Sequence, residues 1–334
     1  MAAKVVKAAI VGASTLLGKE LANELNASAS TVWDLKLLDA SLADVGMATG
    51  QIASAGDEAI LIQTIEPGAL DGMDIVFFAG DAATTLKHWK EARATGSGIV
   101  DVSAALEAEG VVRCPWIQGA GVGAARVVVP AHPAAVMLGQ IVTRLQAKWQ
   151  SVRAVATVME PASQQGSAGL DEMHQQTVAL LSFQAVPKDV YDAQVAFNLS
   201  AALGPETKVD LRAIAARIRR DLRLIAGEEA TNATAMQLLQ APVFNGYTAS
   251  VFVDLDPEAV MGEVESALEG GIVSVVTHDE PGPSNLSATE QGQLLVSVQA
   301  SSDGVRGFWL WMAVDNLKLS AQTAIACAAE LAVV

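Results

Sequence analysis

A histidine stands between two prolines in the stretch VVVPAHPAAVMLG, residues 127–139. Pro133 follows it, and proline is favoured at the first position of a helix, so we expect His132 at a helix N-terminus. The positive end of a helix disfavours imidazolium, which predicts a neutral ring. Such a ring could be an acid or base, a metal ligand or a group without a chemical role. No metal-ligand spacing links it to the other histidines or the two cysteines, so we expect no metal site.

A glycine turn, GASTLLG, occupies residues 12–18. It lies between an apolar β-branched run and a segment with helical spacing, where backbone amides and a helix N-terminus can hold a dinucleotide pyrophosphate. A full G-x-x-G-x-x-G turn would have glycine at position 15, where a threonine side chain can crowd the phosphate. The turn predicts either a nucleotide-binding loop or a tight strand-to-helix connection. The candidate cofactor-binding residues are Gly12, Ser14, Thr15, Leu16 and Leu17.

Asp39 ends the next apolar run, TVWDLKLLD. A carboxylate there can accept hydrogen bonds from an adenine ribose, but it repels the 2′-phosphate of NADP. The loop after it, ASLADVGMATG, has no lysine or arginine to offset the repulsion. If a dinucleotide binds, the sequence favours NAD over NADP.

The elements that must position these residues alternate in type through the first third of the chain. Strand patterns occur in VVKAAIVGA, TVWDLKLLDAS, GMDIVFFAG and GIVDVSAAL, and helical patterns follow the first and the third. Alternating strands and helices predict an α/β fold with a Rossmann-type doubly wound parallel sheet.

The pattern changes from about Val152. SVRAVATVME, GYTASVFVDL, GGIVSVVTH and GQLLVSVQAS have strand patterns separated by long helical or loop segments. This predicts a second, α+β domain with a largely antiparallel sheet. The last segment, NLKLSAQTAIACAAELAVV, has the apolar spacing of a closing helix.

Two stretches of the second domain permit more than one interpretation. VDLRAIAARIRRDLRLIAG contains five arginines, but its apolar residues repeat at helical spacing, which favours an amphipathic helix with a solvated face over an anion site. Trp309 and Trp311 alternate with Leu310 and Met312, so this strand could belong to the core or to an interface.

Composition limits the possible partners. A chain of 334 residues with 51% hydrophobic and 17% charged residues predicts a globular protein of two domains. The net charge of −16 excludes a basic stripe for nucleic acid and disfavours anionic membrane surfaces. The two cysteines are expected to be packed thiols, and the chain starts on a polar-flanked strand pattern instead of a signal peptide, so we expect a cytoplasmic protein.

Eight segments in order carry a family resemblance over nearly the whole chain. They are AAIVGASTLLGKEL, MDIVFFAGDAATT, GIVDVSAALE, VVVPAHPAAVMLGQIVTRL, SAGLDEMHQQT, VAFNLSAALG, APVFNGYTASVFVDL and GFWLWMAVDNLKLSAQTAIACAAEL. Together they resemble the aspartate-semialdehyde dehydrogenase family. The resemblance implies an NAD(P)-binding domain at 1–131, a dimerisation domain at 132–315 and a closing helix at 316–334 that packs back on the first domain. It also adds Ala79 and Gly80, on the nicotinamide side, to the cofactor-binding residues.

The family's catalytic positions are substituted. Its chemistry uses a thiolate at a helix start as the nucleophile, and the matching residue here is His132. The general acid/base histidine becomes Tyr247, and the substrate-positioning glutamine becomes Glu160. The two substrate arginines become Glu107 and Gln240, which removes the charges that hold an anionic substrate.

The chain therefore resembles the Usg-type homologues, which keep the fold and lack the cysteine. We expect a catalytically inactive member that forms a homodimer and retains NAD binding or binds another small molecule. One alternative is an oxidoreductase with non-covalent acid/base chemistry that uses His132, Glu160 and Tyr247. The other is a structural partner of an active family member.

Overall fold

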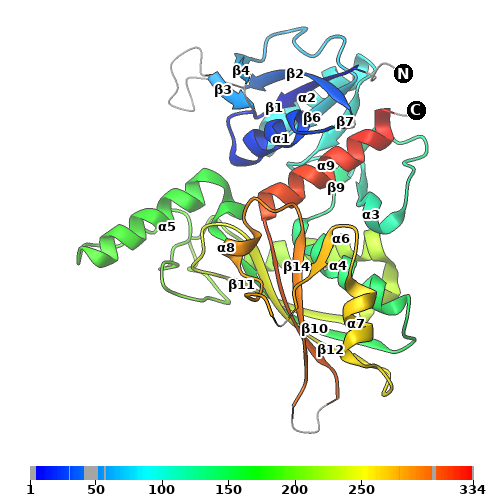
Figure 1. Cartoon of the computed structure of the whole chain (residues 1–334). Coiled ribbons are helices and arrows are strands. Elements are labelled where there is room, and N and C mark those ends of the chain that lie inside the picture. The colour runs from blue at the N-terminus through cyan, green and yellow to red at the C-terminus, as the bar shows by residue number, and fades with distance from the viewer. Residues whose placement is uncertain are drawn as a thin grey trace. The chain divides into compact units, whose positions relative to one another are not determined.

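The computed structural model describes residues 5–29, 31–40, 52–55, 58–277, 279–302 and 306–332. The chain forms two compact units: the first comprises Met1–Ala131 and Ser320–Val334, and the second comprises His132–Leu319 (Figure 1). Residues 41–50, which include most of the loop predicted after Asp39, lie outside the described residues. Within the described ranges, no helix is long and apolar enough to cross a membrane.

The first unit contains a seven-stranded sheet in the order β5-β2-β1-β6-β7-β9-β8. Every neighbouring pair is parallel, which confirms the predicted Rossmann-type sheet. The strands are β1 (Val5–Val11), β2 (Val32–Asp39), β5 (Gln63–Thr64), β6 (Ile75–Phe78), β7 (Gly98–Asp101), β8 (Val111–Arg113) and β9 (Val127–Pro130). A separate antiparallel pair consists of β3 (Ile52–Ala55) and β4 (Glu58–Leu61).

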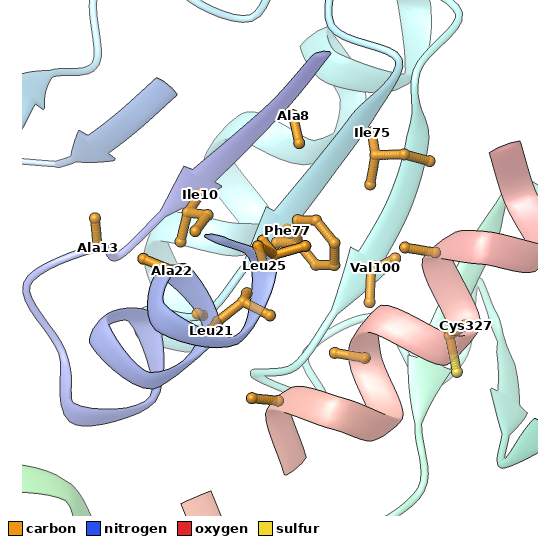
Figure 2. Close-up of a cluster of buried hydrophobic side chains, with 14 of the residues drawn as sticks. Ala8, Ile10, Ala13, Leu21, Ala22, Leu25, Ile75, Phe77, Val100 and Cys327 are labelled. Atoms are coloured by element: carbon orange, nitrogen blue, oxygen red, sulfur yellow. The ribbon is translucent and has the colours of Figure 1, made fainter. Parts of the chain in front are cut away.

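Helices cover both faces of this sheet. The helices are α1 (Leu16–Asn26), α2 (Ala82–Ala94), α3 (Pro115–Gln118) and α9 (Asn316–Ala332). On one face, Leu21 and Leu25 of α1 and Cys327 of α9 pack with Ile10 and Phe77 (Figure 2). A second buried cluster contains the side chains that alternate with these along the strands, together with Trp89 and Ala92 of α2. The period of two along each strand thus supplies both apolar faces of the sheet.

The second unit contains a six-stranded sheet in the order β11-β10-β12-β15-β14-β13. Its three inner pairings are antiparallel and its two edge pairings are parallel, in agreement with the predicted α+β domain. The strands are β10 (Val152–Glu160), β11 (Thr234–Gln240), β12 (Tyr247–Leu255), β13 (Val273–Val275), β14 (Leu294–Ala300) and β15 (Phe308–Val314). The helices are α4 (Pro133–Gln146), the 3₁₀ helix η1 (Ala162–Gln165), α5 (Gly166–Leu181), α6 (Leu211–Asn232), α7 (Met261–Leu268) and α8 (Asn285–Ala288).

The arginine-rich stretch forms the amphipathic helix α6, as predicted. Ile218, Leu222 and Ile225 are buried, and α6 packs against α4. The polar face is not uniformly solvated, because Asp221 is fully buried among the arginines.

One face of the second sheet carries exposed apolar side chains. Trp309 and Trp311 are 46% and 39% exposed, whereas Leu310 and Met312 are buried. Val155 on β10 and Phe252 on β12 share a row with Trp309, and the rings of Phe252 and Trp309 lie 5.1 Å apart. The two tryptophans therefore belong to a surface of the unit and not to its core.

Candidate functional site

The glycine turn connects β1 to α1 in the first unit. Gly12 has a φ of 91°, and a Cβ on it would lie 2.3 Å from the amide nitrogen of Gly80. A Cβ on Gly18 would lie 2.1 Å from the carbonyl oxygen of Gly12. Only glycine fits these places, since real Cβ atoms do not approach backbone so closely. The ends of the neighbouring strands β1 and β6 thus bring two predicted cofactor-binding residues, Gly12 and Gly80, into contact.

Thr15 is the N-cap of α1, and its hydroxyl bonds within the loop. Oγ1 accepts a hydrogen bond from the Gly18 amide at 2.9 Å. It also lies 2.8 Å from the carbonyl oxygen of Gly12 and 2.9 Å from that of Ala79, and can donate its proton to either. The side chain that departs from the glycine pattern is therefore used to hold the loop against β6.

The first turn of α1 has two backbone amide donors that are available to a ligand. The Gly18 and Lys19 amides bond to the Oγ1 and the carbonyl oxygen of Thr15. The amides of Leu16 and Leu17 have no partner within the described residues. A helix N-terminus with unused amides can bind an anion, so these two amides are the donors that a pyrophosphate would use.

Asp39 lies at the end of β2 and is buried. Its Oδ2 accepts a hydrogen bond from the Ser14 amide at 3.0 Å, so the carboxylate anchors the turn. Burial raises the pKa of Asp39, and its hydrogen bonds with Ser14 oppose that rise. Ser14 and Asp39, two of the predicted cofactor residues, are thus bonded to each other.

Asp81, in the connection between β6 and α2, was not among the residues expected from the sequence. It is the N-cap of α2 and accepts hydrogen bonds from the amide of Thr84 at 2.8 Å and from its hydroxyl at 2.9 Å. The Thr84 amide also lowers the pKa of Asp81, so the carboxylate stays charged directly after Gly80. The signal was present in the sequence, since aspartate is a preferred N-cap residue and Asp81 directly precedes a helical run.

His132 is the N-cap of α4 in the second unit and is buried. Its Nδ1 accepts a hydrogen bond from the Ala134 amide at 3.2 Å, and its own amide donates to Asp221 Oδ2 at 3.0 Å. Burial, and then the positive charge of Arg217, hold the pKa of His132 well below its ordinary value. The ring is therefore neutral, and because Nδ1 accepts, its proton is on Nε2.

Glu160 and Tyr247 form a buried pair beside His132. The Tyr247 hydroxyl donates to Glu160 Oε2 at 3.0 Å, and Gln165 Nε2 donates to Oε1 at 2.7 Å. The rings of His132 and Tyr247 meet edge to face, with centroids 6.0 Å apart. Burial raises the pKa of Glu160 to about 7, although both hydrogen bonds oppose the rise. Burial and the Glu160 charge raise the pKa of Tyr247 well above its ordinary value.

The two positions where the family resemblance expects arginines lie in different units. Gln240 is opposite Glu160 in the pairing of β10 with β11, and its Nε2 donates to the Glu160 carbonyl oxygen at 3.1 Å. Gln240 thus joins the cluster of His132, Glu160 and Tyr247. Glu107 lies in the first unit, in the segment after β7, and is half-buried.

The sequence analysis also missed the charged residues that α6 brings to this cluster. Asp221 is buried and accepts from Arg220 Nη2 at 2.8 Å, and its Oδ2 lies 3.7 Å from Arg217 Nε. Arg217 and Asp221 are four positions apart in the sequence, but this spacing is typical of a solvated helix face. Burial of Asp221 depends on the packing of α6 against α4, which the spacing does not reveal.

The two cysteines do not supply the thiolate that the family chemistry uses. Cys114 and Cys327 are buried in the first unit, and burial raises the pKa of Cys114 to about 12 and that of Cys327 as well. Both thiols therefore stay protonated at neutral pH. Across the described ranges, no group of three His, Cys, Asp or Glu side chains is placed to hold a metal ion.

Comparison with known proteins gives two family matches. Residues 7–161 match the model described as semialdehyde dehydrogenase, NAD binding domain, and residues 142–319 match semialdehyde dehydrogenase, dimerisation domain. A USG-1 protein homolog of Azotobacter vinelandii is 27% identical, with 93% of this chain and 92% of that protein covered. Another USG-1 protein homolog, of Pseudomonas aeruginosa, is 25% identical, with 94% and 93% covered.

A solved structure agrees with these matches at the level of the fold. It is a probable aspartate-semialdehyde dehydrogenase from Pseudomonas aeruginosa, with a TM-score of 0.84, 23% identity and 99% of each chain covered. Two family models span almost the whole chain, and the parallel and mixed sheets lie where those models place a nucleotide-binding and a dimerisation domain. The chain belongs to the semialdehyde dehydrogenase family.

Proposed function

We propose that this chain is a catalytically inactive member of its family that binds NAD and forms a homodimer. The observation that carries the proposal is the start of α4. Where the family resemblance expects a thiolate, the chain has His132, a buried neutral imidazole whose Nδ1 is bonded to its own helix. This group offers no sulfur to form a covalent adduct with an aldehyde or an acyl phosphate.

The start of α4 also lacks the donors that stabilise a thiolate. Pro133 has no N–H, and the Ala134 amide bonds to His132 Nδ1. The Ala135 and Val136 amides bond to the carbonyl oxygen of His132 at 2.8 and 3.0 Å. All three amide donors of the first turn thus have partners, so a negative group at this place would gain little from the helix.

The surrounding charges also oppose the family reaction. Glu160 takes the place of a neutral glutamine and its two carboxyl oxygens accept from Tyr247 and Gln165. Gln240 replaces an arginine and bonds to the backbone. An anionic substrate would therefore meet the buried Glu160 carboxyl group, and an uncharged amide where the resemblance expects an arginine.

The glycine turn fits a dinucleotide. The close approach of Gly12 and Gly80 keeps side chains out of the cradle, and the Leu16 and Leu17 amides would hold the pyrophosphate. Asp39 uses Oδ2 for the Ser14 amide, and its carboxylate would accept a ribose hydroxyl and repel a 2′-phosphate. This favours NAD over NADP. NAD, when bound, would accept a hydride. The second unit contains no thiol that could bind the aldehyde covalently and so make it a hydride donor.

The exposed face of the second sheet supports the homodimer. Val155, Phe252 and Trp309 form an apolar row across three strands, with Trp311 on the same face. An exposed apolar surface rimmed by polar residues is typical of a protein interface. The match to a family dimerisation domain supports the same assignment.

One alternative has specific support. A Glu160 pKa of about 7 and a hydrogen bond from Tyr247 are properties of a general acid/base pair, so an oxidoreductase without a covalent intermediate would use these groups with His132. A structural partner of an active relative would need neither this pair nor NAD.

Turnover tests the loss of catalysis. Purified protein is assayed for phosphate-dependent oxidation of aspartate semialdehyde with NAD and with NADP, and we expect none above background. His132→Cys restores only the nucleophile, and we expect it to remain inactive because Glu160, Gln240 and Tyr247 are unchanged. Turnover by the unmodified protein would refute the proposal, and turnover by His132→Cys alone would show that the other substitutions are not disabling.

Calorimetric titration tests the cofactor. We expect saturable NAD binding and at least tenfold weaker NADP binding, because the 2′-phosphate would lie near Asp39. Asp39→Asn should narrow this difference. Failure of both nucleotides to bind would remove the cofactor assignment and favour the structural partner.

Sedimentation velocity tests the dimer. We expect a dimer for the unmodified chain and a monomer for Trp309→Glu, since a buried unpaired carboxylate opposes association. Leu86→Glu is the matched control, because Leu86 is also an exposed apolar residue but lies on α2 in the first unit. A dimer in both variants would place the interface elsewhere.

A further inference from the structure

Two adjoining hollows lie along α6 and together form what we name the α6 groove. The first has a volume of about 210 Å³ and is lined mainly by apolar residues, among them Leu138 of α4, Leu222 of α6 and Met236 of β11. The second has a volume of about 290 Å³ and lies along α6 toward its C-terminal end. Ala216 and Arg219 line both hollows, so the two lie next to each other.

The second hollow is basic in a strongly acidic chain. Arg219, Arg220 and Arg223 line it, with Glu228 as its one acidic lining residue. The chain as a whole carries a net charge of −16. Three guanidinium groups within five positions of one helix therefore give a local positive field, which attracts an anion.

The three arginines differ in how far their charge is compensated. Arg220 bonds to the buried Asp221 at 2.8 Å. Arg223 lies 3.8 Å from Glu228 at an exposed position. Arg219 donates Nη1 to the Thr234 carbonyl oxygen at 3.3 Å and has no carboxylate partner among the described residues. This bond orients an uncompensated guanidinium at the junction of the apolar and basic hollows.

We propose that the α6 groove binds a small amphiphilic oxyanion, a carboxylate or phosphate attached to a short apolar chain or ring. Arg219 and Arg223 hold the oxyanion, since guanidinium groups match the geometry of both head groups. The apolar part enters the hollow lined by Leu138, Leu222 and Met236. A purely polar anion leaves this hollow unfilled, and a neutral apolar molecule leaves the arginine charge unused. This site does not depend on NAD or on the proposed loss of catalysis.

Binding to the full-length protein tests the proposal with four probes in calorimetry. Octanoate and octyl phosphate carry both features, inorganic phosphate carries only the charge, and 1-octanol carries only the chain. We expect saturable binding of the first two and at least tenfold weaker binding of the other two. Equal binding of octanoate and inorganic phosphate would overturn the amphiphilic assignment, and no saturable binding of either amphiphile at millimolar concentration would overturn the site.

Variants then locate the site. Arg219→Gln removes the uncompensated charge, and Ala216→Trp fills the junction of the two hollows. Both should weaken octanoate binding at least tenfold while the circular dichroism spectrum and the NAD affinity stay unchanged. Arg212→Gln is the matched control, because Arg212 is an exposed arginine of the same helix outside the groove. Octanoate binding within twofold of the unmodified protein for both Arg219→Gln and Ala216→Trp would overturn the proposal.

Discussion

The N-termini of α1 and α4 are built alike but differ in whether they leave backbone amides available to a ligand. Each follows a buried parallel strand, and each is capped by a side chain, Thr15 in one and His132 in the other. At α1 the cap uses the third amide of the helix and leaves those of Leu16 and Leu17 available. At α4 no first-turn amide is available, because Pro133 has no N–H and the next three amides all bond to His132. A helix N-terminus is therefore a binding site only when its own residues leave donors for a ligand.

The two regions also differ in what holds them. The α1 turn is held by the Thr15 and Asp39 side chains, but its shape also requires close backbone contacts that only glycine permits at Gly12 and Gly18. The cluster at α4 is fixed by buried polar side chains from four elements, α4, β10, β12 and α6. Four predictions follow from this difference, beginning with the largest expected effect.

Gly12→Ala should disrupt the first unit. The new Cβ would meet the Gly80 backbone at 2.3 Å and would occupy a φ of 91°, so the loop must move or the unit must unfold. We expect a loss of about 3 kcal/mol or more in the free energy of unfolding, together with loss of NAD binding. Urea denaturation measures the change. Gly262→Ala is the control, because this α7 glycine has open space around its Cβ and should be neutral or stabilising.

Glu160→Gln should change how stability depends on pH. The pKa of Glu160 rises from 4.5 to about 7 on folding, so as the pH increases through this range the unfolded chain releases a proton that the folded chain keeps. Its contribution is thus fully present below pH 4.5 and is lost as the pH rises to about 7. Relative to Glu160→Gln, the unmodified protein should lose on the order of 3 kcal/mol across this window.

The pH effect requires its own control. The pKa of His132 is lowered, so its contribution has the opposite sign and is lost as the pH falls through 6.5. The His132 contribution is the same in the unmodified protein and in Glu160→Gln, so it cancels when their free energies of unfolding are subtracted. Denaturation curves at several pH values give that difference, with exposed Glu228→Gln as the reference substitution. Parallel curves for Glu160→Gln and the unmodified protein would mean that Glu160 is not buried in solution.

His132→Ala should destabilise the second unit by about 2 kcal/mol, since it removes both the cap and the ring contact with Tyr247. His132→Asn keeps a side chain that caps a helix well, so its cost should be about 1 kcal/mol smaller. Thermal and urea denaturation measure the pair. Equal losses would show that the Nδ1 cap contributes nothing.

Thr15→Ala should have the smallest effect, about 1 kcal/mol, because it removes a cap at a partly exposed position. Thr15→Ser keeps the hydroxyl and should lie within a few tenths of a kcal/mol of the unmodified protein. NAD affinity should change less than threefold in Thr15→Ser, since the hydroxyl bonds within the loop. A large gain in affinity for Thr15→Ala would indicate that the threonine obstructs the phosphate.

Much of the fold could be read from local patterns. The alternation of strands and helices predicts the parallel sheet, and the β-branched runs after Val152 predict the second sheet. Trp309 and Trp311 could not be assigned, because one strand pattern serves equally for a buried strand and for an exposed apolar face. Only the pairing with Phe252 and Val155 puts these side chains on the open face.

The candidate site was partly predictable. The resemblance gave His132, Glu160, Tyr247 and Gln240, and the structure brings these four together in the second unit. It gave no sign of Asp221, since an aspartate among arginines on a helix is typical of a solvated face. The hydrogen bond between His132 and Asp221 joins residues 89 positions apart, which no local pattern predicts.

The sequence by itself determined the order of the elements, the family and the residue types at the positions that match the family's catalytic residues, because periodicity and residue identity are local properties of the chain. Only the tertiary structure decided what those residues can do. Burial gives Glu160 a pKa of about 7 and keeps His132 neutral, and packing of α6 brings Asp221 to the His132 amide. Burial and long-range hydrogen bonds depend on which segments meet, and that is settled only when the chain is folded.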